Sequence, residues 1–418
     1  MAVAPEYMPR VLDTELAKLL TGLPAVLIEG PKAVGKTATA RRVCVDELLL
    51  DDPAIQAVAR ADPSSLVADR GTPLLVDEWH LVGPVFDAVR RQVDNDSGPG
   101  RFVLTGSARP EGVTAHTGAG RIVTIRMRPM TLLERGVTSP TVSLAGLVRR
   151  GGGSVNGHSE FGLAEYAHEI EASGFPGIRP RPESFRQSLL EGYIDSVIQR
   201  DVEEAGHRVR RPDTLRRWLE AIAAATATTT SLEKIRNAAT RGDGSVPTKQ
   251  TVLNYHHALR RLWIVDDLDG WSPSSSRFTT LNRAPKRHMA DPALALALLG
   301  LDHSALMADG FLFGRMFESL AALTLRVFGQ AAGARVKHLR TKGGRQEVDF
   351  IVERRDGRVL ALEAKLGRTI DDDDVAHLLW LRSRLGPRWI DGAVVSTGPI
   401  AYRRSDGIAV IPLALLGP

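Results

Sequence analysis

A glycine-rich turn between an apolar segment and a helix-forming segment constrains this chain more than any other stretch. From Gly30 to Thr37 the residues follow the pattern Gly-x-x-x-x-Gly-Lys-Thr. Such a turn lets backbone N–H groups curl around a phosphate, and the helix that follows adds the positive end of its dipole. The sequence therefore predicts a strand, a phosphate-binding loop and a helix, with ATP as the ligand.

The residues of this loop have separate chemical roles. We expect Lys36 to reach the β- and γ-phosphates and the Thr37 hydroxyl to ligate Mg²⁺, so that ATP and Mg²⁺ are the expected cofactors. The alternative is a glycine-containing turn that binds nothing. The expected nucleotide-binding residues are Gly30, Pro31, Lys32, Ala33, Val34, Gly35, Lys36, Thr37 and Ala38.

Two adjacent carboxylates follow the next apolar segment. Leu74–Val76 has strand character and leads directly into Asp77 and Glu78. The carboxyl ends of parallel strands meet at one edge of a sheet, which is also where a phosphate loop lies. We therefore expect Asp77 to hold Mg²⁺ and Glu78 to polarise the attacking water. The alternative is that the two carboxylates only cap the following helix.

Small hydroxyl residues end a third apolar segment. Thr105 and Ser107 follow Phe102–Leu104, and a polar side chain at this position can contact the γ-phosphate or the attacking water. We prefer Ser107 of the two, with plain turn residues as the alternative. Arg121 precedes a last strand and is a candidate for contacting a phosphate, although an ordinary solvated arginine explains it equally well.

Length and pattern divide the chain into several regions. At 418 residues it is too long for one ordinary core. Alternating strands and helices predict an α/β ATPase core over residues 1–150. Residues 151–212 are expected to form a helical lid, beginning with a flexible glycine-rich linker or loop at 151–158. Arg179 and Arg200 are both candidates for acting on the nucleotide from this lid.

Residues 213–300 have the order of a winged helix. A helix, a turn, a second helix capped near 245–248 and two short strands, at 264–268 and 277–281, follow one another. From residue 207 to 287 there are 15 Lys and Arg against 7 Asp and Glu, a net charge of +8, compared with +5 for the whole chain. This concentration predicts contact with nucleic-acid phosphates, most simply those of duplex DNA. The alternative is a module for packing or dimerisation.

A helix and a hairpin in residues 301–418 place three acidic residues and a lysine together. Glu318 lies in the predicted helix, Asp349 in the first strand, and Glu363 and Lys365 in the returning strand. Alternation predicts that Val348, Phe350 and the other apolar residues occupy one face, and that the charged residues share the other face. Carboxylates that bind Mg²⁺ beside a lysine suit metal-assisted hydrolysis of a phosphodiester. A solvated hairpin face is the alternative. The acidic run at 371–374 is expected to cap a helix.

Taken together, these motifs resemble those of bacterial and archaeal AAA-type ATPases that carry a C-terminal restriction-endonuclease-like domain. The residues that carry the resemblance are Gly30–Thr37, Leu74–Glu78, Leu104–Ser107, Gly174–Pro176, Tyr193, Arg200, Asp201, Glu347–Phe350 and Leu362–Lys365. The resemblance implies an α/β protein with a P-loop parallel-sheet core, a helical lid, a winged helix and a C-terminal α/β domain over residues 301–418. It also implies that Glu318, Asp349, Glu363 and Lys365 follow the PD-(D/E)xK nuclease pattern.

These features predict an ATP-binding and ATP-hydrolysing protein that acts with nucleic acid, with metal-dependent nuclease activity in its C-terminal domain. The alternative is a nucleotide-switched regulator or partner-binding protein without cleavage. The expected catalytic residues are Lys36, Glu78, Ser107, Asp349, Glu363 and Lys365, and the expected metal ligands are Thr37, Asp77, Glu318, Asp349 and Glu363.

Composition predicts a cytoplasmic protein. Cys44 is the single cysteine, so no internal disulfide can form, which fits a reducing compartment. The chain has no apolar run of about 18 residues, so we expect no membrane span. The N-terminal residues lack the pattern of a secretion signal. A homo-oligomer is compatible with all of these features.

Overall fold

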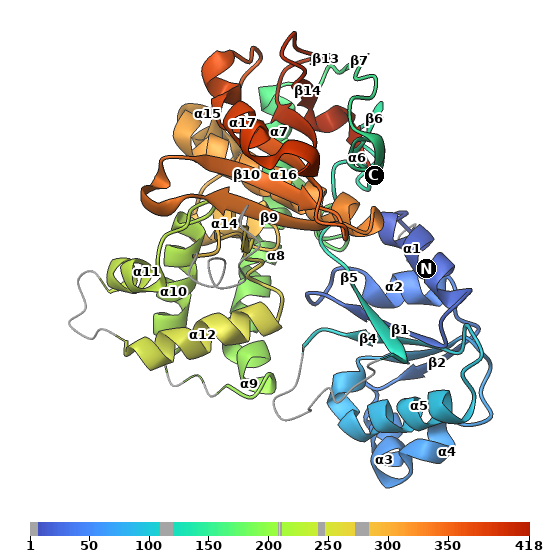
Figure 1. The fold of residues 1–418 in the computed structure, drawn as a ribbon. Helices are drawn as coiled ribbons and strands as arrows, with labels where there is room; N and C mark the ends of the chain where they lie inside the picture. The colour runs from blue at the N-terminus through green and yellow to red at the C-terminus, as the bar shows by residue number, and fades with distance from the viewer. Residues whose placement is uncertain (1–6, 109–119, 208, 210, 241–246, 272–283) are drawn as a thin grey trace.

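The computed structural model describes residues 7–108, 120–207, 209, 211–240, 247–271 and 284–418. Two large sheets, one two-stranded sheet and a set of helices make up this part of the chain (Figure 1). The N-terminal sheet, in blue and teal, and the C-terminal sheet, whose central strands are orange and red, are separate. The green and yellow helices lie beside them.

The N-terminal sheet is parallel and has five strands in the order β2-β3-β4-β1-β5. Its strands are β1 (Ala25–Glu29), β2 (Asp46–Leu49), β3 (Leu74–Asp77), β4 (Phe102–Gly106) and β5 (Ile122–Arg126). Its helices are α1 (Val11–Leu20), α2 (Lys36–Arg41), α3 (Pro53–Ala61), α4 (Pro63–Val67), η1 (Trp79–Val82) and α5 (Gly83–Asn95). All five residues of β1 are buried because α1 and α2 cover one face of the sheet while α3, α4 and α5 cover the other. The predicted α/β core with a parallel sheet is confirmed.

The middle of the chain is helical. It consists of α7 (Leu163–Glu171), α8 (Glu183–Ser196), the π-helical turn η2 (Val197–Asp201), α9 (Val202–Glu204), α10 (Pro212–Ala224), α11 (Leu232–Ala239) and α12 (Lys249–Arg261). Thr248 caps α12 because its hydroxyl accepts a hydrogen bond from the Thr251 N–H. After α12, single antiparallel bridges join Val265 to Met289 and Leu268 to Lys286. The strand predicted at 277–281 lies outside the described residues.

The C-terminal sheet is mixed and has eight strands in the order β7-β13-β14-β12-β11-β10-β9-β8. These are β7 (Gly157–His158), β8 (Gly270–Trp271), β9 (Arg335–Arg340), β10 (Glu347–Glu353), β11 (Val359–Lys365), β12 (Trp389–Ser396), β13 (Ile400–Arg403) and β14 (Ala409–Pro412). The helices around it are α6 (Leu144–Arg150), α14 (Pro292–Leu299), α15 (His303–Ala308), α16 (Gly310–Ala331) and α17 (Asp372–Leu385), and three short 3₁₀ turns are η3 (Lys342–Gly344), η4 (Gly386–Arg388) and η5 (Leu413–Leu415).

The central hairpin of this sheet is buried on both faces, and one part of the predicted alternation is wrong. Phe350 packs in the core formed with α16, whereas Val348 packs with Ile351 in the core formed with α17. The reason is an extra residue in β10 between its pairings with Leu339 and Lys337 of β9. Such a bulge redirects the side chains beside it, and Asp349 lies within it.

Residues 142–158 pack against the C-terminal sheet. Strand β6 (Val142–Ser143) pairs with β15 (Leu416–Gly417), and β7 pairs with β13. A Cβ on Gly151 would lie 2.5 Å from the carbonyl oxygen of Ile390, so this glycine permits a close approach of two backbones. The glycine-rich stretch is therefore docked on the sheet and is not the free linker that its composition suggested.

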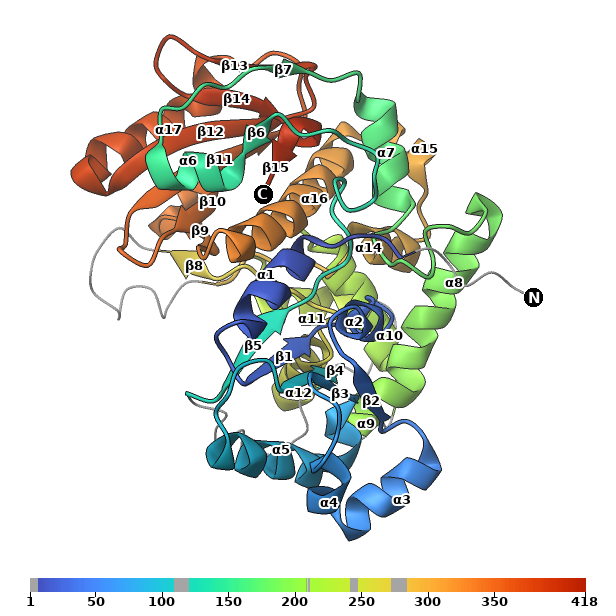
Figure 2. The ribbon, with the colours of Figure 1, turned by 90° about the vertical axis from the view of Figure 1, so that its right-hand side faces the viewer.

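Helix α1 packs between the N-terminal sheet and helix α16 of the C-terminal region. Figure 2 shows α1 between the N-terminal sheet and α16, and Gln330 of α16 donates a hydrogen bond of 3.0 Å to Glu15 of α1. Within the described residues, none of the helices has the combination of length and apolar character needed to cross a membrane.

Candidate functional site

The backbone conformation of the phosphate loop restricts which amino acids can occupy several of its positions. A Cβ on Gly30 would lie 2.2 Å from the carbonyl oxygen of Met127, so a larger residue cannot occupy this position. Gly35 has a φ of 104°, which lies in the left-handed region that favours glycine. Ala33 also has a positive φ, of 61°. The sequence pattern thus corresponds to a curled loop at the N-terminus of α2.

Lys36 is folded back onto its own loop. Its Nζ donates to the carbonyl oxygens of Gly30 (3.1 Å) and Pro31 (2.9 Å) and lies 3.3 Å from the Ser107 Oγ. Burial lowers the pKa of Lys36, against the charges of Glu78 and Asp77 that raise it. A bound phosphate would therefore take the place of the neutral carbonyl acceptors and bring full negative charge to the Lys36 ammonium.

Asp77 joins the loop to the strand end next to it. The Thr37 hydroxyl donates to the two carboxylate oxygens of Asp77 at 2.9 and 3.1 Å, and the Thr105 hydroxyl donates to one of them. Burial raises the pKa of Asp77, and the hydrogen bonds from Thr105 and Thr37 oppose that rise. A hydroxyl and a carboxylate side by side are the hard oxygen ligands that Mg²⁺ prefers, so the predicted residues fit this ion.

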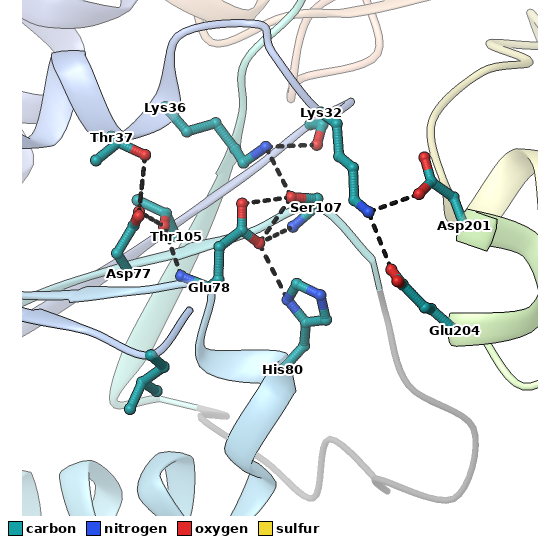
Figure 3. Close-up of polar contacts among 12 residues, drawn as sticks. Lys32, Lys36, Thr37, Asp77, Glu78, His80, Thr105, Ser107, Asp201 and Glu204 are labelled. Carbon is teal, nitrogen blue, oxygen red and sulfur yellow. Dashed lines mark hydrogen bonds and ion pairs between the residues drawn. The ribbon is translucent and has the colours of Figure 1, made fainter. Parts of the chain in front are cut away.

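Glu78 takes part in a different set of contacts (Figure 3). The Ser107 hydroxyl lies 2.6 and 2.7 Å from its two carboxylate oxygens, and the Ser107 N–H donates to it at 3.2 Å. The His80 Nδ1 is 3.2 Å from the same carboxylate. Burial would raise the pKa of Glu78, but the Lys36 charge and the Ser107 hydrogen bonds hold it below its usual range. Glu78 is therefore an ionised carboxylate beside the phosphate loop.

The helical region contacts the loop through Lys32. Its Nζ lies 2.6 Å from Asp201 Oδ1 and 3.0 Å from Glu204 Oε2, as Figure 3 shows. The Tyr193 hydroxyl also donates to the carbonyl oxygen of Lys32, at 3.3 Å. The sequence identified Lys32 only as a loop residue, because no local spacing links it to acidic residues about 170 positions away.

The three candidate arginines all have partners in the described part of the chain. Arg121 forms an ion pair with Asp94 of α5. Arg179 makes a two-pronged pair with Glu169 at 2.7 and 2.9 Å. Arg200 donates to the Ser196 hydroxyl one helical turn earlier. No contact of these arginines with the phosphate loop was found among the described residues.

The C-terminal acidic residues do gather as the sequence predicts. Asp349 accepts a hydrogen bond of 3.0 Å from the backbone N–H of Ala364, next to Glu363 on the paired strand. Burial and the neighbouring Asp349 carboxylate raise the pKa of Glu363 well above its usual range. Burial raises the pKa of Glu318 to about 8, with Asp349 as the next cause. Together with Glu347, these three residues form a carboxylate cluster in which Glu363 is buried and the other three side chains are partly exposed.

A lysine that the sequence did not single out occupies the centre of this cluster. The Lys286 Nζ lies 2.8 Å from Glu318, 2.9 Å from Asp349 and 3.3 Å from Glu347. Burial would raise the pKa of Asp349, but the Lys286 charge brings it to about 2. A Mg²⁺ ion binds its oxygens at about 2.0–2.1 Å and does not fit between the same carboxylates while this ammonium is there.

Lys365 points to another partner. Its Nζ is 3.4 Å from Asp374 in the first turn of α17, and its side chain is 37% exposed.

The run at 371–374 caps α17 as predicted, because Asp371 and Asp374 exchange hydrogen bonds with each other's backbone N–H groups.

A cavity separates α12 from the N-terminal sheet. It has a volume of about 460 Å³ and is lined by Arg126 of β5 and by Asn254, His257 and Arg260 of α12. These three α12 residues are exposed and lie on one face of the helix. Part of the positive charge counted in the sequence is not on this surface, since Lys286 and Arg287 are buried in ion pairs.

Comparisons with known proteins divide the chain into three matched parts. A family model described as an AAA domain matches residues 23–135. Two models described as domains of unknown function, DUF8612 and DUF4143, match residues 164–305 and 313–416. With the loop geometry above, the first match identifies the N-terminal part as a P-loop domain of the AAA type, the kind of domain that binds and hydrolyses ATP.

Individual relatives are distant. The uncharacterized proteins Rv2008c of Mycobacterium tuberculosis (strain ATCC 25618 / H37Rv) and Mb2031c of Mycobacterium bovis (strain ATCC BAA-935 / AF2122/97) are each 24% identical to this chain over 292 residues. The match covers 69% of this chain and 58% of each relative. A solved structure, the Walker-type ATPase PABY2304 of Pyrococcus abyssi, is 14% identical with a TM-score of 0.38, over 68% of this chain and 94% of that one.

Proposed function

We propose that this protein hydrolyses ATP at the phosphate loop and uses the nucleotide state to control a nucleic-acid-binding surface on α12. The observation that carries the ATPase proposal is the pair of adjacent carboxylates with separate partners. Asp77 is held by hydroxyls of the loop and of β4, and Glu78 is held by Ser107. This arrangement supports Asp77 as the residue that holds the metal and Glu78 as the residue that orients the water.

Each residue has a defined task in the proposed reaction. Lys36 leaves the loop carbonyls and pairs with the β- and γ-phosphates of ATP. Glu78, ionised at neutral pH, accepts a hydrogen bond from the attacking water and orients it, while Ser107 fixes the carboxylate. Thr37 and Asp77 would hold Mg²⁺, which supplies charge neutralisation on the phosphate oxygens when it is bound.

Two substitutions test hydrolysis. We expect Glu78→Gln to keep ATP binding but to lower kcat about 100-fold or more, because it removes the group that orients water. Lys36→Ala should remove both binding and hydrolysis. Phosphate release and binding of a fluorescent ATP analogue measure the two effects, with Lys18→Ala on the exposed side of α1 as the matched lysine control. Wild-type kcat in Glu78→Gln would contradict the proposed role.

Nucleic-acid binding is proposed from the exposed face of α12 that carries His257 and Arg260, and from the cavity beside it, whose lining includes Asp266, Asp267 and Asp269 as well as the basic residues. The order α10, α11, α12 and the antiparallel bridges supports a winged-helix arrangement, in which the last helix meets the nucleic acid. We expect Arg260→Ala to weaken duplex DNA binding and to reduce the slope of log Kd against log salt by about 1. Fluorescence anisotropy at several salt concentrations measures this slope.

The matched control is Arg149→Ala, an exposed arginine on α6 beside the other sheet. If both variants bind duplex DNA as wild type does, with the same salt slope, then α12 is a packing module and the nucleic-acid proposal fails.

A second candidate function is a nucleotide-switched binding protein that does not cleave nucleic acid. Lys286 favours it over the nuclease reading, because its ammonium takes the position that a catalytic metal needs. The mixed sheet with clustered acids supports an endonuclease-like fold for residues 301–418, and folds of this type also serve in binding alone.

A further inference from the structure

The carboxylate cluster of the C-terminal sheet already contains a cation that belongs to the chain. The Lys286 ammonium is within 3.3 Å of oxygens from three acidic side chains, which come from α16 and β10. Its side chain is 1% exposed, although lysine is almost never fully buried unless it is paired. The lysine therefore sits inside the protein because the carboxylates are there.

The charges of the cluster explain this placement. Glu318, Glu347 and Asp349 surround the ammonium, and Glu363 lies beside Asp349. Several buried carboxylates close together repel one another and need a positive charge among them. Either a divalent cation or an ammonium can supply that charge, and the two cannot occupy the same few ångströms.

The backbone fixes Lys286 in this position. Its N–H donates to the carbonyl oxygen of Leu268 at 2.9 Å, and its own carbonyl accepts from the Leu268 N–H at 2.8 Å. The next residue, Arg287, exchanges backbone hydrogen bonds with Ala227 and Thr228. The lysine therefore lies in a segment whose backbone is anchored by hydrogen bonds on both sides of the chain.

We propose that Lys286 takes the place of a metal ion in the carboxylate cluster, so that the wild-type C-terminal sheet holds an internal ammonium and binds no divalent cation there. This inference does not depend on ATP hydrolysis. It predicts that the cluster becomes a divalent-cation site when the ammonium is removed, because the remaining oxygens are suitable ligands for Mg²⁺ or Mn²⁺.

Mn²⁺ binding to the full-length, nucleotide-free protein tests the proposal. Electron paramagnetic resonance of free Mn²⁺ gives the number of ions bound per chain. Wild type and Asp349→Asn should bind the same number, since the cluster contributes no site in either. Lys286→Met should bind about one Mn²⁺ more, and Lys286→Met combined with Asp349→Asn should lose this ion. Lys337→Met, a lysine of β9 paired with Glu353, is the matched control and should gain none.

Two results would overturn the proposal. The first is a Mn²⁺ ion that wild type binds and Asp349→Asn loses, which would mean that a metal displaces Lys286 in solution. The second is a folded Lys286→Met protein with no additional Mn²⁺. If Lys286→Met does not fold, the comparison of wild type with Asp349→Asn still shows whether a metal displaces Lys286. Lys286→Gln, which keeps a polar side chain, then replaces Lys286→Met in the test for an additional Mn²⁺ ion. If the Mn²⁺ measurements contradict this proposal, the Lys36→Ala and Glu78→Gln tests of ATP hydrolysis are unaffected.

Discussion

Asp77 and Glu78 are neighbours in the chain but interact with different parts of the site. Strand β3 ends at Asp77, whose carboxylate remains among the hydroxyls of Thr37 and Thr105. Glu78 has a φ of 50°, a left-handed conformation that is uncommon for residues other than glycine and clusters at functional sites. This turn of the backbone directs the second carboxylate toward Ser107. One change of backbone conformation therefore gives the two carboxylates separate partners, as the proposed division into a metal-binding acid and a water-orienting acid requires.

His288 gives a prediction at the scale of one side chain. Burial, with the charges of Lys286 and Arg326, lowers its pKa to about 3, against the opposing charges of Asp266 and Asp267. The unfolded chain takes up a proton near pH 6.5 and the folded protein does not, so stability falls as pH decreases from 6.5 toward 3. Between pH 7 and 5.5 the free energy of unfolding should fall by about 1 kcal/mol more in wild type than in His288→Asn. Chemical denaturation at both pH values measures the difference, and equal losses in the two proteins would contradict the assignment.

Features set by short local patterns were predicted from the sequence, whereas features set by pairing between distant segments were not. The loop, its helix and the ends of β3 and β4 follow from short patterns, because each role depends on residues within a few positions. The bulge in β10 was not predictable, since Val348 and Phe350 have the same apolar character and only pairing with β9 sends them to opposite faces. Lys286 was missed for a similar reason: its partners are 32 and 63 residues away and no spacing rule connects them.

The contact between α9 and the phosphate loop predicts an effect on ATP affinity. Asp201 and Glu204 hold Lys32 and place negative charge near the expected phosphate position. Asp201→Asn removes one of these charges and releases Lys32 toward the nucleotide. We expect the Kd for ATP to fall about fivefold, which corresponds to roughly 1 kcal/mol for a partly exposed ion pair. Titration with a fluorescent ATP analogue measures it.

The control for this variant is Asp195→Asn, which breaks the ion pair between Asp195 of α8 and Arg216 of α10 and leaves the Lys32 contacts in place. Weaker ATP binding by Asp201→Asn would mean that Asp201 holds the loop in its binding conformation and does not compete with the nucleotide.

Asp266 connects the three regions of the molecule. It lies in the segment after α12 and pairs with Arg126 (2.9 Å) and Arg128 (2.8 Å) of the N-terminal domain and with Arg326 (2.7 Å) of α16. Its backbone N–H donates to His288, two residues from Lys286. The N-terminal domain, the segment after α12 and helix α16 therefore share one buried charge network.

Removing that charge tests the connection at the scale of the whole molecule. Asp266→Asn leaves three buried arginines with less compensation, and breaking a buried ion pair typically costs about 3–5 kcal/mol. We expect a marked fall in Tm by calorimetry. Asp94→Asn, which affects the exposed pairs with Arg90 and Arg121, should change Tm little. Equal changes in the two variants would show that the network does not stabilise the assembly of the regions.

The π-helical turn at Val197–Asp201 determines where the helical region meets the phosphate loop. A π turn contains one residue more than an α-helical turn, and successive residues of an α-helix are about 100° apart around the axis. Helix α8 runs into this turn and α9 runs out of it, so the extra residue sets the rotation of Asp201 and Glu204 relative to the start of α8. Shortening the turn by one residue would rotate both carboxylates away from Lys32 without altering any amino acid that touches the nucleotide. The number of residues in this turn therefore keeps the two carboxylates aligned with Lys32 of the phosphate loop.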